Sequence, residues 1–301
     1  MKIELVTSTN LENCQLFMRG KVRDVYDLGK HYLIISTDRL SAFDVVFREA
    51  IPYKGIVLNQ LSEFWFQKTK GIIENHFVST DVIKQYPDLL PDQNLLSHRS
   101  MLVKKAKPMA FEFIVRGYLM GSAFEQYKKD GTIAGKKYTH GLILGSKFKE
   151  PLFTPSTKEN VGHDVNISFE TLVNQIGAEK AIFIKDTSLK LFSEASNHAH
   201  KNGILIADTK LEFGETEEGI MLIDEIFTPD SSRFILKADY DIGYSDRTFD
   251  KQFVRNFLTD SGWNKEPPPP SLPDDIVQKT SQRYLEAYKL LTGKDLVQEL
   301  V

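Results

Sequence analysis

Apolar and charged side chains alternate in the segment "ADTKLEFG", residues 207–214. Asp208, Lys210 and Glu212 occupy every second position, and the residues between them are apolar or nearly so. Because successive side chains of a β-strand point to opposite faces, this spacing predicts a strand with one charged face and one apolar face. Taken alone, the pattern is more typical of a half-solvated strand whose charges pair across a sheet than of a binding site.

The segment that follows changes this interpretation. It contains a loop ending at Gly219, an apolar run beginning at Ile220, and then the two acids Asp224 and Glu225. This order predicts a β-hairpin, which brings two sets of carboxylates close together. Their mutual repulsion has to be neutralised by cations. Lys210 supplies one such charge, and we expect a magnesium ion to supply the rest.

Similar patterns predict the elements on either side of this hairpin. Two strands, over residues 22–26 and 32–36, are joined by the turn-rich "DLGK". Apolar residues at helical spacing predict helices over residues 53–71 and 179–201. The last helix of the chain should bury one stripe of side chains, formed by Val277, Tyr284, Tyr288 and Leu291.

A short helix is predicted after the apolar segment that follows Pro108. Ser122 and Glu125 have the spacing of a capping box, so the helix should begin at Ser122 and end at Gly131. Helices and hairpins are mixed without βαβ alternation, which predicts the α+β class. We expect two lobes with a cleft between them: residues 1–107 and residues 108–301.

Composition restricts the classes of protein that this chain can be. It has 301 residues, of which 41% are hydrophobic, enough for a large core. A net charge of −3 gives no overall field that favours nucleic acid or a membrane surface. Cys14 is the single cysteine, which excludes an internal disulfide framework and indicates the cytoplasm. We find no apolar run of about 20 residues and no secretory signal.

Two groups of residues are candidates for binding phosphate. In "GKVRDVYDLGK", Lys21 and Arg23 could lie over phosphates as the glycine-rich hairpin of protein kinases does, although an ordinary exposed hairpin is the commoner explanation. Arg116 at a strand end and Ser122 at a helix start would suit a phosphomonoester. The simpler alternative is that Ser122 only caps its helix.

Further polar residues gather in predicted loops and on one helix. His163 and Asp164 lie in a loop whose composition suits binding, with a solvated turn as an equal alternative. "STDRLSAFD" offers Asp38 and Ser41, which a capped turn also explains. For three further cations, a surface salt bridge is the commoner explanation: Arg233, Lys251 and Arg255.

These motifs, in this order, resemble the SAICAR synthetase (phosphoribosylaminoimidazole-succinocarboxamide synthase) family over almost the whole chain. The two most specific stretches are "PMAFEFIVRGYLMGS" (108–122) and "IADTKLEFG" (206–214). "GKVRDVYDLG", "STDRLSAFD", "PSTKENVGHD" and "IDEIFTPDSSRF" fit as well. The proline-rich segment 266–273, which precedes the last helix, is similar to the longer form of the family found in yeast and some bacteria.

The resemblance implies a ligase. ATP, carboxyaminoimidazole ribonucleotide (CAIR) and L-aspartate would give SAICAR, ADP and phosphate through an acyl phosphate, in purine biosynthesis. The implied fold is an antiparallel-sheet lobe over a larger α+β lobe, distantly similar to protein kinases and ATP-grasp enzymes, with ATP between the lobes. The implied partners are these small molecules, without nucleic acid or membrane, and the chain would be a monomer or a small homo-oligomer.

The resemblance also implies roles for single residues. Lys210 falls near the ATP phosphates, Glu212 near the ribose hydroxyls, Asp224 on a magnesium ligand and Glu225 beside it. Four residues fall on the hairpin that covers the phosphates: Gly20, Lys21, Val22 and Arg23.

Other positions of the family pattern concern the second and third substrates. Asp208 would hold the ribonucleotide, and Asp164, with His163 beside it, would lie near the imidazole and the incoming amine. Asp38 and Ser41 fall on a mobile loop that closes over the substrates. Arg116, Ser122 and Arg233 fall on positions that contact the ribonucleotide. Lys251 and Arg255 match basic positions that would bind substrate.

Two other functions are alternatives. A kinase-like phosphotransferase acting on a hydroxyl should carry H-R-D with a downstream Asn, and D-F-G. The chain contains neither motif. A non-catalytic nucleotide-binding module would be expected to lose charged site residues, whereas every motif here keeps them.

Overall fold

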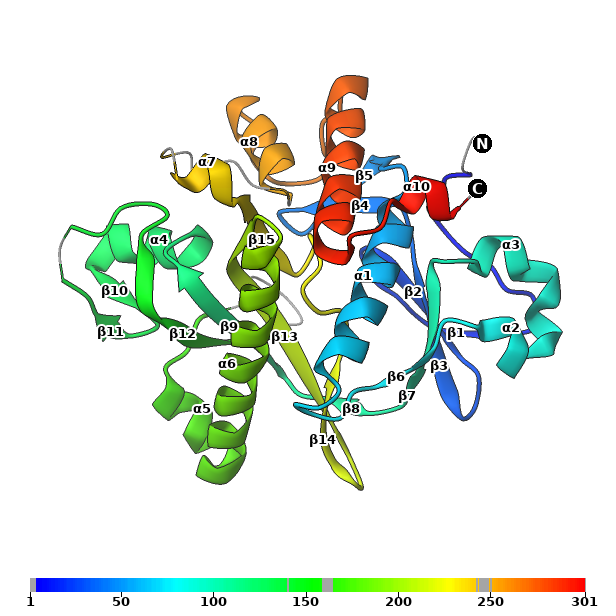
Figure 1. Ribbon diagram of the computed structural model, residues 1–301, viewed down its shortest axis with the longest axis horizontal. Helices are drawn as coiled ribbons and strands as arrows, with labels where there is room; N and C mark the ends of the chain where they lie inside the picture. Colours follow the sequence, from blue (N-terminus) through cyan, green and yellow to red (C-terminus); the bar gives the residue numbers. More distant parts are fainter. Residues whose placement is uncertain are drawn as a thin grey trace.

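The computed structural model describes residues 4–139, 141–158, 165–241, 243, 249 and 251–300. Within these residues, two large antiparallel sheets stand side by side and helices pack against them (Figure 1). The mixture of helices with antiparallel sheets confirms the α+β class. In the described part of the chain, no helix is both long enough and apolar enough to cross a membrane.

The first sheet is built from the N-terminal third of the chain, in the order β1-β2-β3-β7-β6. The predicted hairpin is confirmed as β2 and β3, but strand β1, which precedes it, was not foreseen. All five residues of β1 are exposed, so it lacks the alternation that marks a half-buried strand. The strands of this sheet are β1 (Gln15–Arg19), β2 (Arg23–Asp27), β3 (His31–Ser36), β6 (Phe77–Ser79) and β7 (Ser100–Lys104).

Short helices cover one side of this sheet, on the right of Figure 1: α2 (Val82–Gln85), the 3-10 helix η1 (Pro87–Asp92) and α3 (Gln93–Leu96). They bury Leu89 and Leu96 against Leu33 and Ile35 of β3. A separate ribbon, β4 (Arg39–Ala42) and β5 (Val45–Ala50), packs on helices α8 (Gln252–Asp260) and α9 (Asp274–Thr292). The expected loop around Ser41 was therefore wrong: Ser41 is part of a strand.

The second sheet has the long strand β13 (Ile204–Thr216) at its centre. The predicted hairpin is confirmed, since β13 pairs with β14 from Glu212↔Ile223 to Thr216↔Gly219. Because β13 also pairs with β9 and β15, its residues have neighbours on both sides. The other strands of this sheet are β8 (Lys107–Pro108), β9 (Phe111–Tyr118), β12 (Lys147–Thr157), β14 (Gly219–Ile223) and β15 (Ser232–Leu236).

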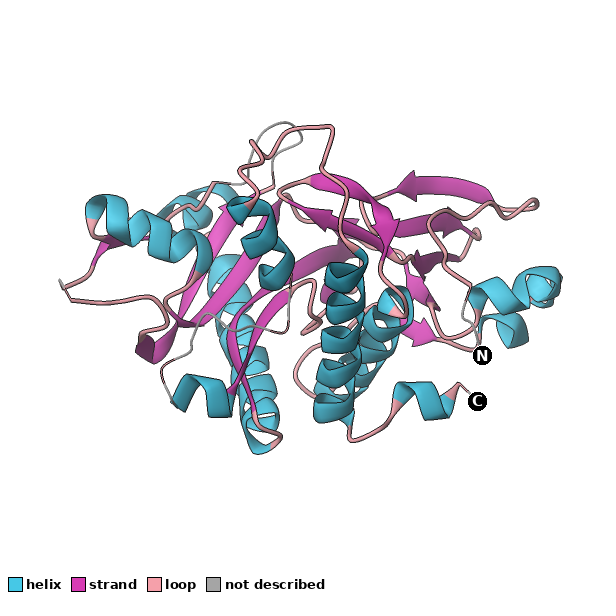
Figure 2. Cartoon of the chain, turned by 90° about the horizontal axis from the view of Figure 1, so that it is seen from above, coloured by secondary structure: helices cyan, strands magenta, loops and turns pink. Residues whose placement is uncertain are grey.

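Helix α6 (Ala178–Lys201), confirmed at its predicted place, packs across the second sheet with α5 (Phe169–Ile176) beside it (Figures 1 and 2). Smaller elements complete this half: α4 (Gly121–Asp130), β10 (Thr132–Ile133), β11 (Lys136–Lys137), α7 (Lys237–Asp241) and α10 (Leu296–Glu299).

The start of α4 differs from the prediction. The helix begins at Gly121 after Met120, and no side chain caps it. Ser122 lies within the first turn, so the predicted capping box was wrong, although Gly131 ends the helix as expected with φ of 71°. This frees the Ser122 hydroxyl from the capping role and leaves it for other contacts.

One apolar core joins the two halves. Helix α1 (Lys54–Thr69) lies beside α9, and its Trp65 belongs to the same buried cluster as Phe113 and Phe213 of the second sheet. Of the predicted stripe on α9, Tyr284, Tyr288 and Leu291 belong to this cluster and Val277 to the one around β4. The division into lobes at residue 107 stays a prediction, as does the distant similarity to kinases and ATP-grasp enzymes.

Candidate functional site

A cleft of about 1040 Å³ lies between the two sheets. Its lining includes the turn between β1 and β2, the start of α4, strand β13, the segment after β14, and α8. A smaller pocket of about 170 Å³ adjoins it. Six residues line both: Ser122, Lys210, Asp230, Arg233, Lys251 and Arg255.

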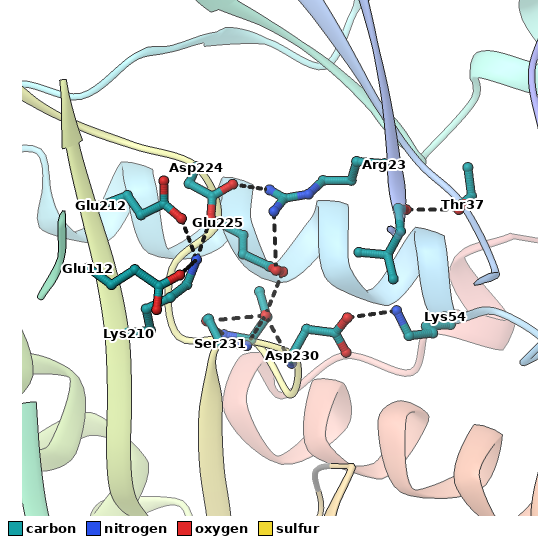
Figure 3. Close-up of polar contacts among 12 residues, drawn as sticks. Arg23, Thr37, Lys54, Glu112, Lys210, Glu212, Asp224, Glu225, Asp230 and Ser231 are labelled. Carbon is teal, nitrogen blue, oxygen red and sulfur yellow. Dashed lines mark hydrogen bonds and ion pairs between the residues drawn. The ribbon is translucent and has the colours of Figure 1, made fainter. Parts of the chain in front are cut away.

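On the charged face of β13, Lys210 and Glu212 line this cleft and Asp208 lines the smaller pocket. Leu211 and Phe213 of the same strand are buried in the core. Lys210 Nζ lies 2.5 Å from Glu212, 2.9 Å from Asp224 and 3.7 Å from Glu112 (Figure 3). Burial by itself lowers the pKa of Lys210, but the carboxylates, Asp224 first, raise it well above its ordinary value. Lys210 therefore carries a permanent positive charge surrounded by acids.

A second cation enters the same cluster from the first sheet. Arg23, the first residue of β2, places its guanidinium 2.5 Å from Asp224 and 3.5 Å from Glu225. Asp224 follows the last residue of β14 and has φ of 66°, in the left-handed region, which turns its side chain back toward β13. Despite burial, Arg23 and Lys210 hold the pKa of Asp224 well below its ordinary value. The two halves of the molecule therefore meet through opposite charges.

His76 holds the backbone of this turn. Its Nε2 lies 3.1 Å from the carbonyl oxygen of Asp224, to which it donates. The ring is buried, and burial lowers its pKa from 6.5 to about 4. The imidazole in the folded protein is therefore neutral at neutral pH.

This buried imidazole predicts acid sensitivity. Between about pH 6.5 and pH 4, the unfolded chain binds a proton on His76 that the folded chain does not. The stabilisation by neutral His76 is therefore complete above pH 6.5 and decreases as the pH falls toward 4. We expect the urea midpoint of the protein to decrease more between pH 7 and pH 4.5 than that of His76→Gln, which keeps a donor but does not titrate. Equal decreases would contradict this prediction.

Beyond Lys210, toward the smaller pocket, two arginines converge on Asp208. The register explains this: Arg116 of β9 and Arg233 of β15 are the cross-strand partners of Asp208 on its two sides. Their guanidinium nitrogens lie 3.1 Å and 2.5 Å from Asp208 Oδ2. Arg116 also donates to the hydroxyl of Ser122 at 3.2 Å. Two cations against one carboxylate leave a net positive patch beside Ser122.

Gly121 allows the close approach of helix α4 to this patch. A β-carbon at position 121 would lie 2.5–2.7 Å from the guanidinium of Arg233, and the glycine has φ of 57°. Any side chain here would therefore collide with Arg233. The glycine lets the first turn of α4, with its unpaired backbone N–H groups, face the cations.

Asp230 joins three elements at the floor of the cleft. Its Oδ2 accepts from Lys54 at 2.8 Å and from Lys251 at 2.9 Å. Arg255, one helical turn after Lys251, lines both pockets with it. The predicted pair of basic positions is thereby brought into the cleft.

The remaining predicted residues have different positions. Lys21 pairs with Asp44 at 2.5 Å, with both side chains more than half exposed. Asp38 does not line the cleft: it is buried, and accepts from the N–H groups of Val6 and Gly55 and from Arg99. Five residues placed on the hairpin or the mobile loop do line it: Gly20, Lys21, Val22, Arg23 and Ser41. His163 and Asp164 lie outside the described residues.

Several residues that line the cleft or contact its lining were not foreseen. Glu112 contacts Lys210, and it precedes Arg116 by four positions on one face of the strand, a spacing that indicated a role. Lys158 donates to Glu212 at 2.7 Å from the segment after β12. Lys54 is a charged residue at the start of a largely apolar helix, and this position also indicated a role in the site. Nothing local marked His76.

The opposite wall of the cleft is apolar. It consists of side chains from the first sheet and from the segment before β9, including Val25, Ile34, Val103, Ala106 and Pro108. Ile223 of β14 faces the same space. An apolar slot beside a charged floor suits a planar base with phosphates attached.

Comparisons with known proteins agree with this architecture. The model of the SAICAR synthetase family matches residues 16–270. The phosphoribosylaminoimidazole-succinocarboxamide synthase of Thermodesulfovibrio yellowstonii is 50% identical over 290 residues, 96% of this chain and 99% of that protein. That of Geobacter sulfurreducens is 50% identical over 293 residues, 97% and 99% of the two chains.

Solved structures give the same answer. SAICAR synthase from Saccharomyces cerevisiae, complexed with SAICAR, has a TM-score of 0.87 at 40% identity, covering 96% of this chain and 99% of that one. A type-2 SAICAR synthetase in complex with ADP has a TM-score of 0.69 at 22% identity, with 92% and 98% covered, and shares the fold. The kinase-like alternative is not favoured by any of these similarities. The chain belongs to the SAICAR synthetase family, whose members join CAIR and L-aspartate in purine biosynthesis.

Proposed function

We propose that this chain catalyses the ATP-dependent joining of CAIR and L-aspartate, and that the cleft between the sheets is its active site. The observation that carries the proposal is the adjacency of two charged clusters. Lys210 and Asp208, at the centres of the two clusters, share strand β13, and the clusters line adjoining pockets. One cluster suits a metal-bound triphosphate, and the other suits the phosphate of a ribonucleotide.

ATP is assigned to the larger pocket. The base would lie in the apolar slot, with the ribose near Glu212 and the phosphates under the turn formed by Gly20, Lys21, Val22 and Arg23. Lys21 supports this assignment because its pair with Asp44 is exposed, and such pairs contribute little stability. It can therefore exchange that carboxylate for a phosphate at small cost.

Magnesium is assigned to Asp224 and Glu225. Among the described residues there is no group of three or more acids, histidines or cysteines arranged to hold a metal. The donors nevertheless fit Mg²⁺, which uses one or two carboxylates together with phosphate oxygens and water. When bound, the ion would neutralise charge on the transferred phosphoryl group. In its absence Arg23 and Lys210 balance the carboxylates.

The 5′-phosphate of the ribonucleotide is assigned to Ser122 with Arg116 and Arg233. A guanidinium offers two parallel donors to a phosphate, and the first turn of α4 adds backbone N–H groups. Asp208 fixes both arginines and lies close enough to contact the same substrate. Lys251 and Arg255 supply further positive charge for the anionic substrates.

The reaction needs charge neutralisation and orientation more than a protein nucleophile. A carboxylate oxygen of CAIR attacks the γ-phosphorus of ATP, ADP leaves, and an acyl phosphate forms. The amine of L-aspartate then attacks the acyl carbon, phosphate leaves, and the nitrogen loses a proton. Lys210 stabilises the negative charge on the transferred group, and Asp164, with His163 beside it, stays a candidate for contacting the amine.

The proposed setting is the cytoplasm, where the chain would act as a monomer or small homo-oligomer on small molecules. Asp38, which is buried, is proposed only to support the ribbon that carries Ser41.

The test is an assay of purified protein with ATP, Mg²⁺ and CAIR, scored for ADP release and SAICAR formation. We expect both to depend on L-aspartate, one ADP being released for each SAICAR formed. ADP release that is equally fast without L-aspartate would contradict the proposal and favour a phosphotransferase.

A further inference from the structure

Tyr284 lies beyond residue 270, where the match to the family model ends, and it contacts Asp230 at the floor of the cleft. Its hydroxyl donates to Asp230 Oδ1 at 2.6 Å, while Asp230 Oδ2 accepts from Lys54 and Lys251. Four elements therefore meet at one carboxylate: α1, the turn before β15, the start of α8, and α9. Figure 3 shows Asp230 directed at Lys54 from that turn.

The charged side chains of this group differ in their exposure to solvent. Lys54 and Asp230 have almost no exposed side-chain surface, whereas Lys251 retains 12%. Burial lowers the pKa of Lys54, although Asp230 opposes that effect. Lys54 neutralises the Asp230 carboxylate from the buried side. Asp230 can therefore orient Lys251 without cancelling the positive charge of Lys251. The group of two cations and one anion presents a net positive charge to the cleft.

Tyr284 fixes the carboxylate in this arrangement. With Oδ1 held by the hydroxyl, Oδ2 is kept between the two ammonium groups. The tyrosine is itself anchored, since its ring is completely buried and Ser281, one turn earlier, donates to the carbonyl of Pro52 at 2.8 Å. The C-terminal helix is thus rigidly attached to the start of α1.

We propose that Tyr284, with Lys54, is a positioning residue that acts through Asp230 to direct Lys251 at an anionic substrate in the cleft. The proposal rests on the proposed function, because it assigns Lys251 to substrate binding. Tyr284 itself touches no substrate. Its effect should appear in the KM for CAIR or L-aspartate more than in kcat.

The same helix provides a matched control. Tyr288, one turn after Tyr284, is also buried and also donates to a carboxylate, Glu299 of α10, at 2.8 Å. Tyr288 lines neither pocket. Tyr284→Phe and Tyr288→Phe therefore each remove one buried hydroxyl that donates to an acid, and only the first should affect the site.

The experiment measures the three KM values and kcat for both variants, at a temperature about 20 °C below the lower of their melting midpoints. We expect Tyr284→Phe to raise the KM for CAIR or L-aspartate about five- to tenfold, with kcat changed less than threefold. Tyr288→Phe should change each value less than twofold. If Tyr284→Phe raises neither KM beyond the control, the positioning role is overturned.

A second experiment, in the Lys251→Met protein, tests whether the effect of Tyr284 depends on Lys251. In Lys251→Met, adding Tyr284→Phe should have no further effect on the same KM, because coupled residues are not additive. A full additional effect there would overturn the proposal. Aspartate-dependent SAICAR formation by the unmodified protein is measured first, so failure of the proposed function is recognised separately: it would abolish that activity, whereas failure of this inference would leave it intact.

Discussion

We expect Lys210→Met to lower kcat about 10³-fold while the protein remains folded. Lys210 lies 2.5–3.7 Å from three carboxylates, and in the proposed reaction its charge stabilises the transferred phosphoryl group. Loss of a group that stabilises transition-state charge has effects of this size. Arg23 and Lys158 still pair with Asp224 and Glu212, so the remaining acids keep partners. The measurement is steady-state kcat, with circular dichroism to check folding.

The control for this change is Lys180→Met. Lys180 of α6 pairs with Glu215, which lies on the same strand as Lys210, but it lines neither pocket. Its kcat should stay within twofold of the unmodified protein. A Lys210→Met protein that is folded and has normal turnover would remove Lys210 from the reaction, and with it the central assignment of the site.

The second large effect is expected for Asp224→Asn, which should lower kcat about 10²- to 10³-fold and raise the Mg²⁺ concentration needed for half-maximal activity. The amide keeps the shape of the side chain but removes the charge that a hard cation requires. Asparagine also tolerates the left-handed backbone at this position, so the turn should persist. The measurement is a magnesium titration of the initial rate at saturating ATP.

Asp275→Asn provides the comparison for that titration. Asp275 forms an exposed pair with Lys279 at 2.9 Å on α9, and it lines neither pocket. Its magnesium dependence should match that of the unmodified protein. An Asp224→Asn protein with an unchanged magnesium requirement would show that the ion, if used, is held elsewhere.

Local patterns were reliable where one residue spacing had one physical explanation. The alternation on β13 predicted which side chains face the two pockets, and Gly131 predicted the end of α4. The capping box failed because Ser122 has the right spacing but a better partner: Arg116, six residues earlier, which only the folded sheet brings near. Spacing along a chain cannot rank a local hydrogen-bond donor against a distant one.

Local sequence patterns also did not predict which residue of a motif reaches the cleft. Asp38 and Ser41 belong to one motif three residues apart, and both are largely buried. Asp38 is bonded to Val6, Gly55 and Arg99, whereas Ser41 lines the cleft. The partners of Asp38 come from three separate segments. A motif can indicate that a residue is needed, but not whether it contacts a substrate or supports the residue that does.

The sequence alone therefore determined the α+β class, the hairpin carrying the acids, and the family to which the chain belongs, because these depend on periodicity and on short motifs. The tertiary structure decided which charges neutralise each other. Arg23 meets Asp224 across the cleft, Arg116 and Arg233 meet at Asp208, and Lys54 meets Tyr284 at Asp230. The physical reason is that electrostatic interaction depends on distance and burial in space, which strand register and helix packing set and residue order does not.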